Sequence, residues 1–350
     1  MKDSSKKEIK SSLTSVLRGK VVDPPPLWLM RQAGRYLPEY RQLRAKAGGF
    51  VELCLDPVAA AEVTLQPITR FDLDAAIIFS DILIVPHALG SKLWFEEGEG
   101  PRLEPLSDRA ALAKTYNSLD RNIVDYVYEA ISRVRSKLAP EVALIGFCGA
   151  PWTVTTYWVA GRGSKDHAAA RRLAAKEPEL FREIIDRLVA TTADHLIGQL
   201  RAGADVVQIF DTWAGELDAG GFKRWCLEPT IEIVRRVRSA MPGAFIILFP
   251  KGVSIDQIEE LVRASKADAV SLDSEANRAL AYKRLQPLCA IQGNLDPEAL
   301  IQGGAALDRA VDAIKKDFRG ARHIFNLGHG IRPETPIAHV ERMIARVRGG

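Results

Sequence analysis

Cysteine is scarce in this chain of 350 residues, and no cysteine belongs to a metal-binding motif. The four cysteines, Cys54, Cys148, Cys226 and Cys289, are far apart and form neither a CxxC nor a CxxH pair. This spacing argues against a structural zinc site and against a disulfide framework, and it is typical of a reducing compartment. We therefore expect a cytoplasmic protein that holds no metal.

The sequence also lacks a long apolar run. The most apolar stretch, residues 74–90, is interrupted by Asp81 and Pro86 and is too short to span a membrane. Residues 1–10 are rich in Lys and Ser and have no apolar core, so they do not resemble a signal peptide. We expect a flexible polar tail over residues 1–19 and no membrane partner.

Neither sign of charge dominates the chain. The sequence has 48 Lys and Arg residues against 44 Asp and Glu residues, a net charge of +4, and no basic block interleaved with aromatic residues. This pattern gives no sign of a nucleic-acid partner. With 47% apolar and 26% charged residues, the composition is that of a globular protein.

Short, nearly continuous apolar runs recur along the chain and alternate with helical patterns. Such runs are typical of parallel strands buried on both faces. The eight runs are Leu27–Met30, Ala75–Phe79, Val142–Phe147, Val206–Phe210, Phe245–Phe249, Ala269–Leu272, Ala290–Gln292 and Ile324–Leu327. Helices are expected from Leu119 with Ser118 as N-cap, from Pro178 to Gly203, and over Asp256–Ser265, Asp296–Ile301 and Ala306–Phe318.

Eight strands joined by helices predict an α/β protein with a single (β/α)8 TIM-type barrel. The alternative is a doubly wound open sheet, which usually has a glycine-rich turn after its first strand. Here the first run is followed by residues 31–35, Arg-Gln-Ala-Gly-Arg, which is not a dinucleotide-binding turn. Because no linker is visible, we expect one barrel domain over residues 20–350.

In a barrel, the side chains that follow the strands meet at the C-terminal face. The polar residues that follow the expected strands are therefore candidates for one site. They are Arg31, Arg35, Asp81, Tyr157, Asp211, Thr212 and His329, and Lys251 also ends a strand.

The two arginines have a functional and a structural interpretation. Arg31 and Arg35 are four residues apart and would share a face of a helical turn, where guanidinium groups bind carboxylates or phosphates. The alternative is a solvated basic face paired with Glu39.

Asp81 and His329 also each have a functional and a structural interpretation. Asp81 lies between two apolar runs, so it is either a buried functional carboxylate or a helix N-cap or salt-bridge partner. His329 is flanked by Gly328 and Gly330, which would give a sharp turn and an exposed imidazole, although a loop histidine bonded to the backbone is an alternative.

Five segments closely resemble the uroporphyrinogen decarboxylase family. The first is long and specific, and the order of the family's segments is kept from about Leu27 to Gly330. The segments are Met30–Tyr40 (MRQAGRYLPEY), Phe79–Leu83 (FSDIL), Gly146–Thr153 (GFCGAPWT), Gln292–Pro297 (QGNLDP) and Asn326–Gly330 (NLGHG).

The resemblance implies a barrel, a homodimer and a cofactor-free lyase of heme and tetrapyrrole biosynthesis. Such an enzyme converts the four acetate side chains of uroporphyrinogen III to methyl groups, giving coproporphyrinogen III and four CO2. At matched positions it implies that Arg31 and Asp81 are catalytic. It implies substrate contacts for Arg31, Gln32, Ala33, Gly34, Arg35, Asp81, Tyr157, Phe210, Thr212 and His329.

One departure from the family pattern concerns the residues after the expected strand Val206–Phe210. The family often has Ser followed by His, whereas this chain has Thr212 and Trp213. The threonine keeps the hydroxyl group, so its contact can survive. The first proton donor also stays open, because the guanidinium of Arg31 is a very weak acid and water or a substrate carboxyl group is an alternative.

Two other functions remain as alternatives. A related barrel methyltransferase would hold zinc through His and Cys at late strand ends, but no cysteine is near His329. A non-catalytic porphyrin carrier on the same barrel would not need Arg31, Asp81 and Tyr157 together. Metal content and product analysis would separate these alternatives from a decarboxylase.

Overall fold

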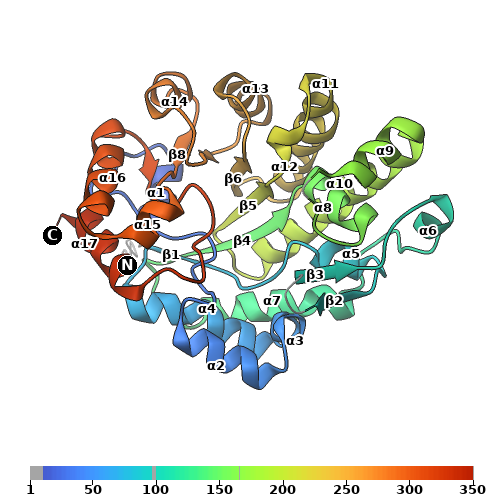
Figure 1. Ribbon diagram of the computed structural model, residues 1–350, viewed down its shortest axis with the longest axis horizontal. Coiled ribbons are helices and arrows are strands. Elements are labelled where there is room, and N and C mark those ends of the chain that lie inside the picture. The colour runs from blue at the N-terminus through green and yellow to red at the C-terminus, as the bar shows by residue number, and fades with distance from the viewer. Residues whose placement is uncertain (1–10, 97–99, 165, 350) are drawn as a thin grey trace, which may run out of the picture.

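A curled sheet of seven parallel strands forms the centre of the protein, and helices cover its outer side (Figure 1). The computed structural model describes residues 11–96, 100–164 and 166–349. The strand order is β1-β4-β5-β6-β7-β8-β9, so each strand of the sheet pairs with its neighbours in sequence. The strands are β1 (Ala75–Ile77), β4 (Ala143–Gly149), β5 (Val206–Asp211), β6 (Phe245–Pro250), β7 (Ala269–Ser271), β8 (Ala290–Gln292) and β9 (His323–Ile324).

The expected first strand, Leu27–Met30, is reduced to one bridge that closes the circle. Leu27 pairs with Phe325 just beyond β9, and the Asp74 N–H donates to Leu27 O over 2.9 Å just before β1. The segment therefore joins the two edges of the seven-stranded sheet. The prediction of a (β/α)8 barrel is confirmed, with the eighth position held by this short segment.

Helices follow the strands in the order that the barrel requires. Several of them begin with proline, which suits a first helical turn because its missing N–H needs no partner there. The helices are α1 (Ser12–Leu17), α2 (Pro38–Ala47), α3 (Phe50–Leu55), α4 (Pro57–Phe71), α5 (Ile84–Ala88), α6 (Arg109–Ala113), α7 (Arg121–Arg135), α8 (Pro151–Ala160), α9 (Ala168–Lys176), α10 (Pro178–Arg201), α11 (Ala219–Gly221), α12 (Glu228–Ala240), α13 (Ile255–Ser265), α14 (Arg278–Leu285), α15 (Pro297–Gln302), α16 (Gly304–Asp317) and α17 (Ile337–Arg348), with a 3-10 turn at Ala214–Glu216 and a π-helical segment at Phe222–Leu227. In the described part of the chain, every helix is too short or too polar to cross a lipid bilayer.

The expected helices are found, with small shifts at their ends. The predicted N-cap Ser118 is wrong: α7 begins at Arg121, and the carboxylate of Asp120 accepts the N–H of Asn122 at the cap. Asp120 is the better cap because a carboxylate also favours the positive end of the helix dipole. Helix α13 has a capping box, in which Ser254 and Gln257 each accept a backbone N–H of the other.

The predicted flexible tail over residues 1–19 is wrong for its second half. Residues 12–17 form α1, and Ser11 caps this helix by accepting the N–H of Thr14. Leu13, Val16 and Leu17 are buried against residues that begin the strands, including Ala75 and Ala143. The other part of the predicted tail, residues 1–10, lies outside the described residues.

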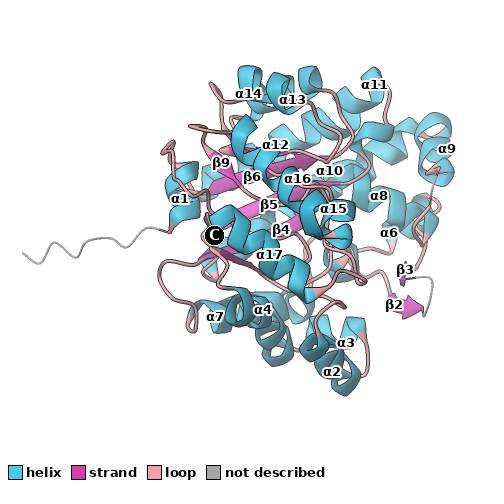
Figure 2. Cartoon of the chain, turned by 60° about the vertical axis from the view of Figure 1, so that its left-hand side comes forward, coloured by secondary structure: helices cyan, strands magenta, loops and turns pink. Residues whose placement is uncertain are grey.

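A two-stranded hairpin follows α5 and was not expected from the sequence. Its strands are β2 (Leu93–Glu96) and β3 (Gly100–Leu103), which pair antiparallel. The guanidinium of Arg44 lies over the rings of both Phe50 and Phe95, at 5.9 and 5.0 Å from their centres. This contact joins the hairpin to α2 and α3, and Figure 2 shows the hairpin at the edge of the molecule opposite α1.

Candidate active site

The C-terminal ends of the strands form a face that we call the mouth, defined by Arg31, Asp81, Tyr157 and His329. Arg31 lies in the turn after the Leu27 segment, and Asp81 lies four residues beyond the end of β1. Tyr157 comes from α8, which begins two residues after β4, and His329 follows β9. The positions are those that parallel strands would bring to one face.

Arg31 has an unusual backbone conformation and an exposed side chain. Its φ angle is 61°, in the left-handed region that few residues other than glycine adopt. The expected helical turn through Arg31 and Arg35 is wrong, because α2 begins only at Pro38. The alternative partner, Glu39, instead forms two hydrogen bonds with Arg70, of 2.8 and 3.0 Å. Arg31 is exposed and forms no ion pair with any described residue.

Asp81 is a partly buried carboxylate with one oxygen engaged. Its Oδ1 accepts the N–H of Leu83 over 2.7 Å, and it forms no ion pair within the described residues. Burial raises the pKa of Asp81, while the Leu83 N–H and the positive charge of Arg31 oppose that shift. Asp81 is therefore neither the N-cap of α5, which is Leu83, nor a salt-bridge partner.

The charges of Asp81 and Arg31 also affect the pKa of Tyr157. Burial and the negative charge of Asp81 raise the pKa of the Tyr157 phenol, and Arg31 and the indole of Trp213 act in the opposite direction. Arg31 and Asp81, from two loops, and Tyr157, from α8, thus affect one another electrostatically. This mutual influence places Arg31, Asp81 and Tyr157 in one neighbourhood.

His329 is partly buried and neutral near pH 7. Burial and the nearby cations Arg31, Lys251 and Arg332 lower its pKa to about 4. Its Nδ1 accepts the N–H of Gly330 over 2.6 Å, so the remaining proton of the neutral ring is on Nε2. His329 therefore presents a hydrogen-bond donor rather than a positive charge.

The residues around Arg31 have mainly structural contacts. The buried side chain of Gln32 accepts the N–H of Leu29 and donates to Ala75 O over 3.1 Å, which joins the turn to β1. Ala33 and Gly34 are partly buried, and Gly34 O accepts the N–H of Leu37 over 3.0 Å. Arg35 is exposed and forms no hydrogen bond or ion pair with a mouth residue in the described part of the chain.

Phe210 and Thr212 lie at the C-terminal end of β5. Phe210 is partly buried, and its ring packs edge-on against Phe147 and Phe249, with centroids 5.7 and 6.1 Å away. Thr212 is partly buried beside Asp211. No contact joins either residue to Arg31 or Asp81, so their part in the site stays a prediction.

Asp211 itself is buried and contacts neighbouring side chains of the protein. Its Oδ1 accepts the hydroxyl of Thr153 over 2.6 Å, and Thr153 also accepts the N–H of Trp213 over 3.2 Å. Burial raises the pKa of Asp211 to about 6, against the effect of Thr153 and the thiol of Cys226. The pair Asp211 and Thr153 thereby fixes the loop that carries Trp213.

Three further residues lie near the mouth that were not predicted from the sequence to belong to the site. Trp213 lies beside Tyr157 and packs against the ring of His167 at 4.7 Å. Lys251 directly follows β6, and its charge lowers the pKa of His329. Asp273 raises that pKa, and its side chain accepts the N–H of Gly252 over 2.7 Å. Asp273 directly follows an expected strand, so the rule that identified Asp81 would also have found it.

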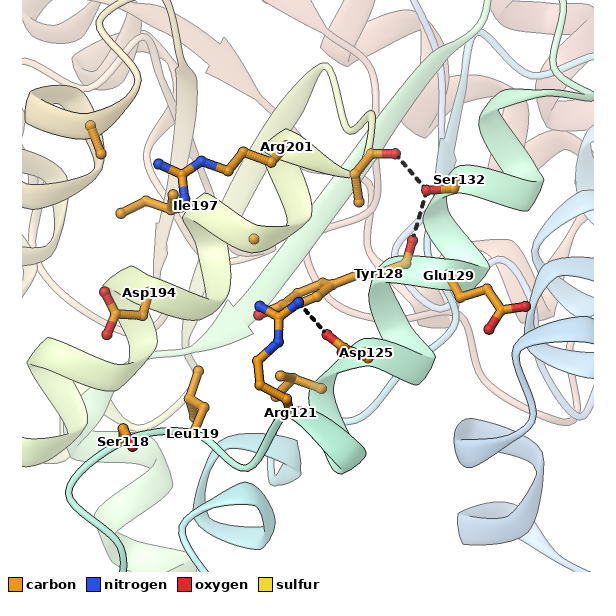
Figure 3. Close-up of a pocket in the computed structure, with 14 residues that line it drawn as sticks. Ser118, Leu119, Arg121, Asp125, Tyr128, Glu129, Ser132, Asp194, Ile197 and Arg201 are labelled. Carbon is orange, nitrogen blue, oxygen red and sulfur yellow. Dashed lines mark hydrogen bonds and ion pairs between the residues drawn. The ribbon is translucent and has the colours of Figure 1, made fainter.

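A hollow lies on the outer surface between α7 and α10, two helices that carry none of these residues. Its volume is about 940 Å³, and Figure 3 shows Arg121 and Tyr128 of α7 facing Asp194 and Arg201 of α10. Arg121 is paired with Asp125 over 2.7 Å within this groove. None of the residues expected from the sequence lines it.

Metal ligands are not grouped in the described residues. No set of three or more His, Cys, Asp or Glu side chains in residues 11–96, 100–164 and 166–349 could hold a metal ion together. The four cysteines are buried and free.

Fold and site together define a β/α-barrel enzyme whose mouth combines an exposed arginine, a carboxylate, a phenol and a neutral imidazole. Residues 9–349 match the family model described as uroporphyrinogen decarboxylase (URO-D). A uroporphyrinogen decarboxylase of Sphingopyxis alaskensis is 53% identical over 350 residues, covering 100% of both chains. One of Rhizorhabdus wittichii is 53% identical over 337 residues, covering 96% of this chain and 97% of the relative. The chain belongs to the uroporphyrinogen decarboxylase family.

Solved structures support the fold independently. A methyltransferase from Methanosarcina mazei has a TM-score of 0.73 at 19% sequence identity, covering 96% of this chain and 97% of the other. At that identity the likeness concerns the architecture alone.

Proposed function

We propose that this protein decarboxylates the four acetate side chains of uroporphyrinogen III to give coproporphyrinogen III. The observation that carries the proposal is the group Arg31, Asp81, Tyr157 and His329 at the mouth of a barrel of this family. In each of the four steps a ring-bound CH2–COOH becomes CH3, one CO2 leaves, and the carboxyl proton balances the new C–H bond. The product belongs to the route to heme and other tetrapyrroles.

Arg31 binds a substrate carboxylate in this proposal. Its guanidinium has no partner among the described side chains, so its charge is available to a ligand. Arg35, also exposed, adds a second cation, and the backbone of residues 32–34 approaches the same carboxylate. Phe210 packs against the macrocycle and Thr212 contributes a hydroxyl contact.

Asp81 stabilises the positive charge that forms on the pyrrole ring. Protonation of a ring carbon makes a cation, and the electrons of the breaking C–CO2 bond then flow into that cation. The free oxygen of Asp81 accepts hydrogen bonds from pyrrole N–H groups, and burial strengthens the charge interaction. The Leu83 N–H and Arg31 both favour the charged form of Asp81 that this role needs.

His329 and Tyr157 complete the contacts as neutral donors. The Nε2–H of His329 can donate to a carboxylate of the substrate, since its Nδ1 is already occupied by the Gly330 N–H. The first proton comes from Arg31, from water or from a substrate carboxyl group. We propose that no metal or organic cofactor is added to this set.

The protein acts as a cytoplasmic homodimer in this proposal, with a free tetrapyrrole as its partner. Sedimentation at micromolar concentration tests the dimer: a single species of twice the chain mass supports it, and a monomer contradicts it.

A methyltransferase is less well supported. The relatives named as decarboxylases are 53% identical to this chain, whereas the methyltransferase is 19% identical. Burial also raises the pKa of Cys148 and Cys289, which opposes formation of a metal-binding thiolate.

The test is anaerobic incubation of the purified protein with uroporphyrinogen III, followed by oxidation and chromatographic separation of the porphyrins. Stepwise loss of carboxyl groups down to four, unchanged by a chelator, supports the proposal. A folded protein that leaves all eight carboxyl groups in place contradicts it.

A further inference from the structure

Gly330 approaches Arg31 so closely that no side chain fits between them. A methyl group at Gly330 would lie 2.8 Å from Arg31 Cγ and 3.0 Å from Nε, and closer still to Cδ. Real Cβ atoms essentially never approach another heavy atom to less than 3.0 Å. Gly330 therefore leaves the space in which the stem of Arg31 lies.

The chain bends at Gly328 and His329, as expected, but the bend does not explain the glycine at position 330. Neither Gly328 nor Gly330 is among the glycines with positive φ, so an L-residue could adopt the backbone at either position. The requirement for glycine at position 330 comes from the neighbouring side chain instead.

The backbone on both sides of the contact is held in place. The Ile331 N–H donates to Met30 O over 2.9 Å, and the Met30 N–H donates to the side chain of Asn326 over 3.0 Å. On the other side of Arg31, the Gln32 N–H donates to Leu29 O over 3.0 Å. Because neither loop can easily retreat, an added methyl group would act mainly on the Arg31 side chain.

We propose that Gly330 is a positioning residue that sets the direction of the Arg31 guanidinium. The proposal rests on the function proposed above, in which Arg31 binds a substrate carboxylate. The left-handed turn at Arg31 and the open space at Gly330 together fix where the stem runs and hence where its charge lies.

Displacement of a binding group by about 1 Å can cost roughly 100-fold in rate. We therefore expect Gly330→Ala to lower kcat/KM by about 10- to 100-fold. Arg31→Ala removes Cγ, Cδ and Nε, the three atoms that lie nearest to the added methyl group. In a chain that already carries Arg31→Ala, the Gly330→Ala change should have no further effect.

The experiment is a double-mutant cycle with the full chain, using Gly330→Ala, Arg31→Ala and both together. Gly243→Ala is the matched control, because a Cβ there meets nothing within 4 Å and its φ is not positive. kcat and KM are measured with uroporphyrinogen III, and the quenching of protein fluorescence by uroporphyrin III gives a binding constant where turnover is too slow. Thermal unfolding is recorded for every variant.

The proposal predicts a loss for Gly330→Ala alone, a change of less than twofold on top of Arg31→Ala, and an unchanged Gly243→Ala. Any lowering of Tm by Gly330→Ala should likewise disappear in the Arg31→Ala background, which covers poor folding of the single variant. Equal losses in both backgrounds, or full activity of Gly330→Ala, overturn the proposal. An inactive wild-type protein would instead refute the proposed function, so the two failures are distinguishable.

Discussion

The two ends of the barrel differ in what their side chains do. At the closed end, Leu13 and Val16 of α1 are buried against Ala75 and Ala143, which begin β1 and β4. At the mouth, Arg31 is exposed and Asp81 is only partly buried. Apolar contacts fill one end, while charged and polar groups gather at the other.

The closed end therefore stabilises the folded protein, whereas the residues of the mouth destabilise it locally. Burial of apolar side chains at α1 is favourable by about 25 cal/mol per Å². At the mouth, a left-handed arginine and a half-buried carboxylate are each unfavourable locally. Variants at the two ends should therefore separate stability from activity.

The largest effect is expected for Asp81→Asn at the mouth. The substitution keeps the volume and removes the charge that would stabilise the pyrrole cation. We expect kcat to fall by about 100- to 1000-fold, with Tm essentially unchanged because Asp81 forms no ion pair with any residue that the structure describes. An unfolded Asp81→Asn protein, seen by circular dichroism, would make Asp81 a structural residue and break the comparison.

At the closed end, Leu13→Ala should show the reverse behaviour. Leu13 is fully buried, and loss of such a side chain costs about 2–5 kcal/mol of unfolding free energy. Urea unfolding measures this cost, and kcat/KM of the folded fraction should remain at the wild-type value. Val21→Ala is the control, since Val21 is 55% exposed and should change stability by less than about 0.5 kcal/mol. A loss of kcat in Leu13→Ala would show that α1 shapes the mouth.

The sequence predicts buried elements well because burial leaves a local pattern. The runs at β5, β6 and β8 are contiguous apolar segments, and each is a strand in the structure. Helix α1 was missed because it has only six residues, and its apolar contacts are made with strands far along the chain.

Site geometry was harder to predict, because it depends on contacts distant in sequence. Arg31 and Asp81 were identified as strand-end residues, but the pairing of Glu39 with Arg70 could not be read from spacing. The same holds for Gly330, whose reason for being glycine is a side chain 299 positions earlier. The low pKa of His329 depends on burial and on cations, of which Arg31 and Lys251 come from two other segments.

A buried histidine at the start of β9 gives a pH test of the closed end. Burial lowers the pKa of His323 to about 4, against the effect of the Gly293 carbonyl that accepts from its Nε2 over 2.6 Å. The unfolded chain, with a histidine pKa near about 6.5, binds more protons between these values, so stability falls as pH drops from about 6.5 towards 4.

His323→Gln should isolate this contribution. The variant is expected to be less stable than wild type at pH 7, and its deficit should shrink by about 2 kcal/mol at pH 5. Urea unfolding at the two pH values measures the difference. A deficit that does not change with pH would mean that His323 is not neutral in the folded protein.

The smallest effect is expected for Arg35→Ala. Because Arg35 is exposed, water screens its interaction with a carboxylate. We expect KM to rise by about two- to fivefold with kcat unchanged, because such an interaction is worth about 1 kcal/mol or less. Steady-state kinetics measure this, and a fall in kcat as large as that of Asp81→Asn would place Arg35 at the reacting centre.

A crystal structure with coproporphyrinogen III bound under anaerobic conditions would test directly whether the tetrapyrrole binds at the mouth. We expect the macrocycle at the mouth, with its pyrrole N–H groups within hydrogen-bonding distance of Asp81 and a carboxylate on Arg31. A macrocycle bound in the groove between α7 and α10, or bound at the mouth with its pyrroles facing away from Asp81, would refute the proposed role of Asp81.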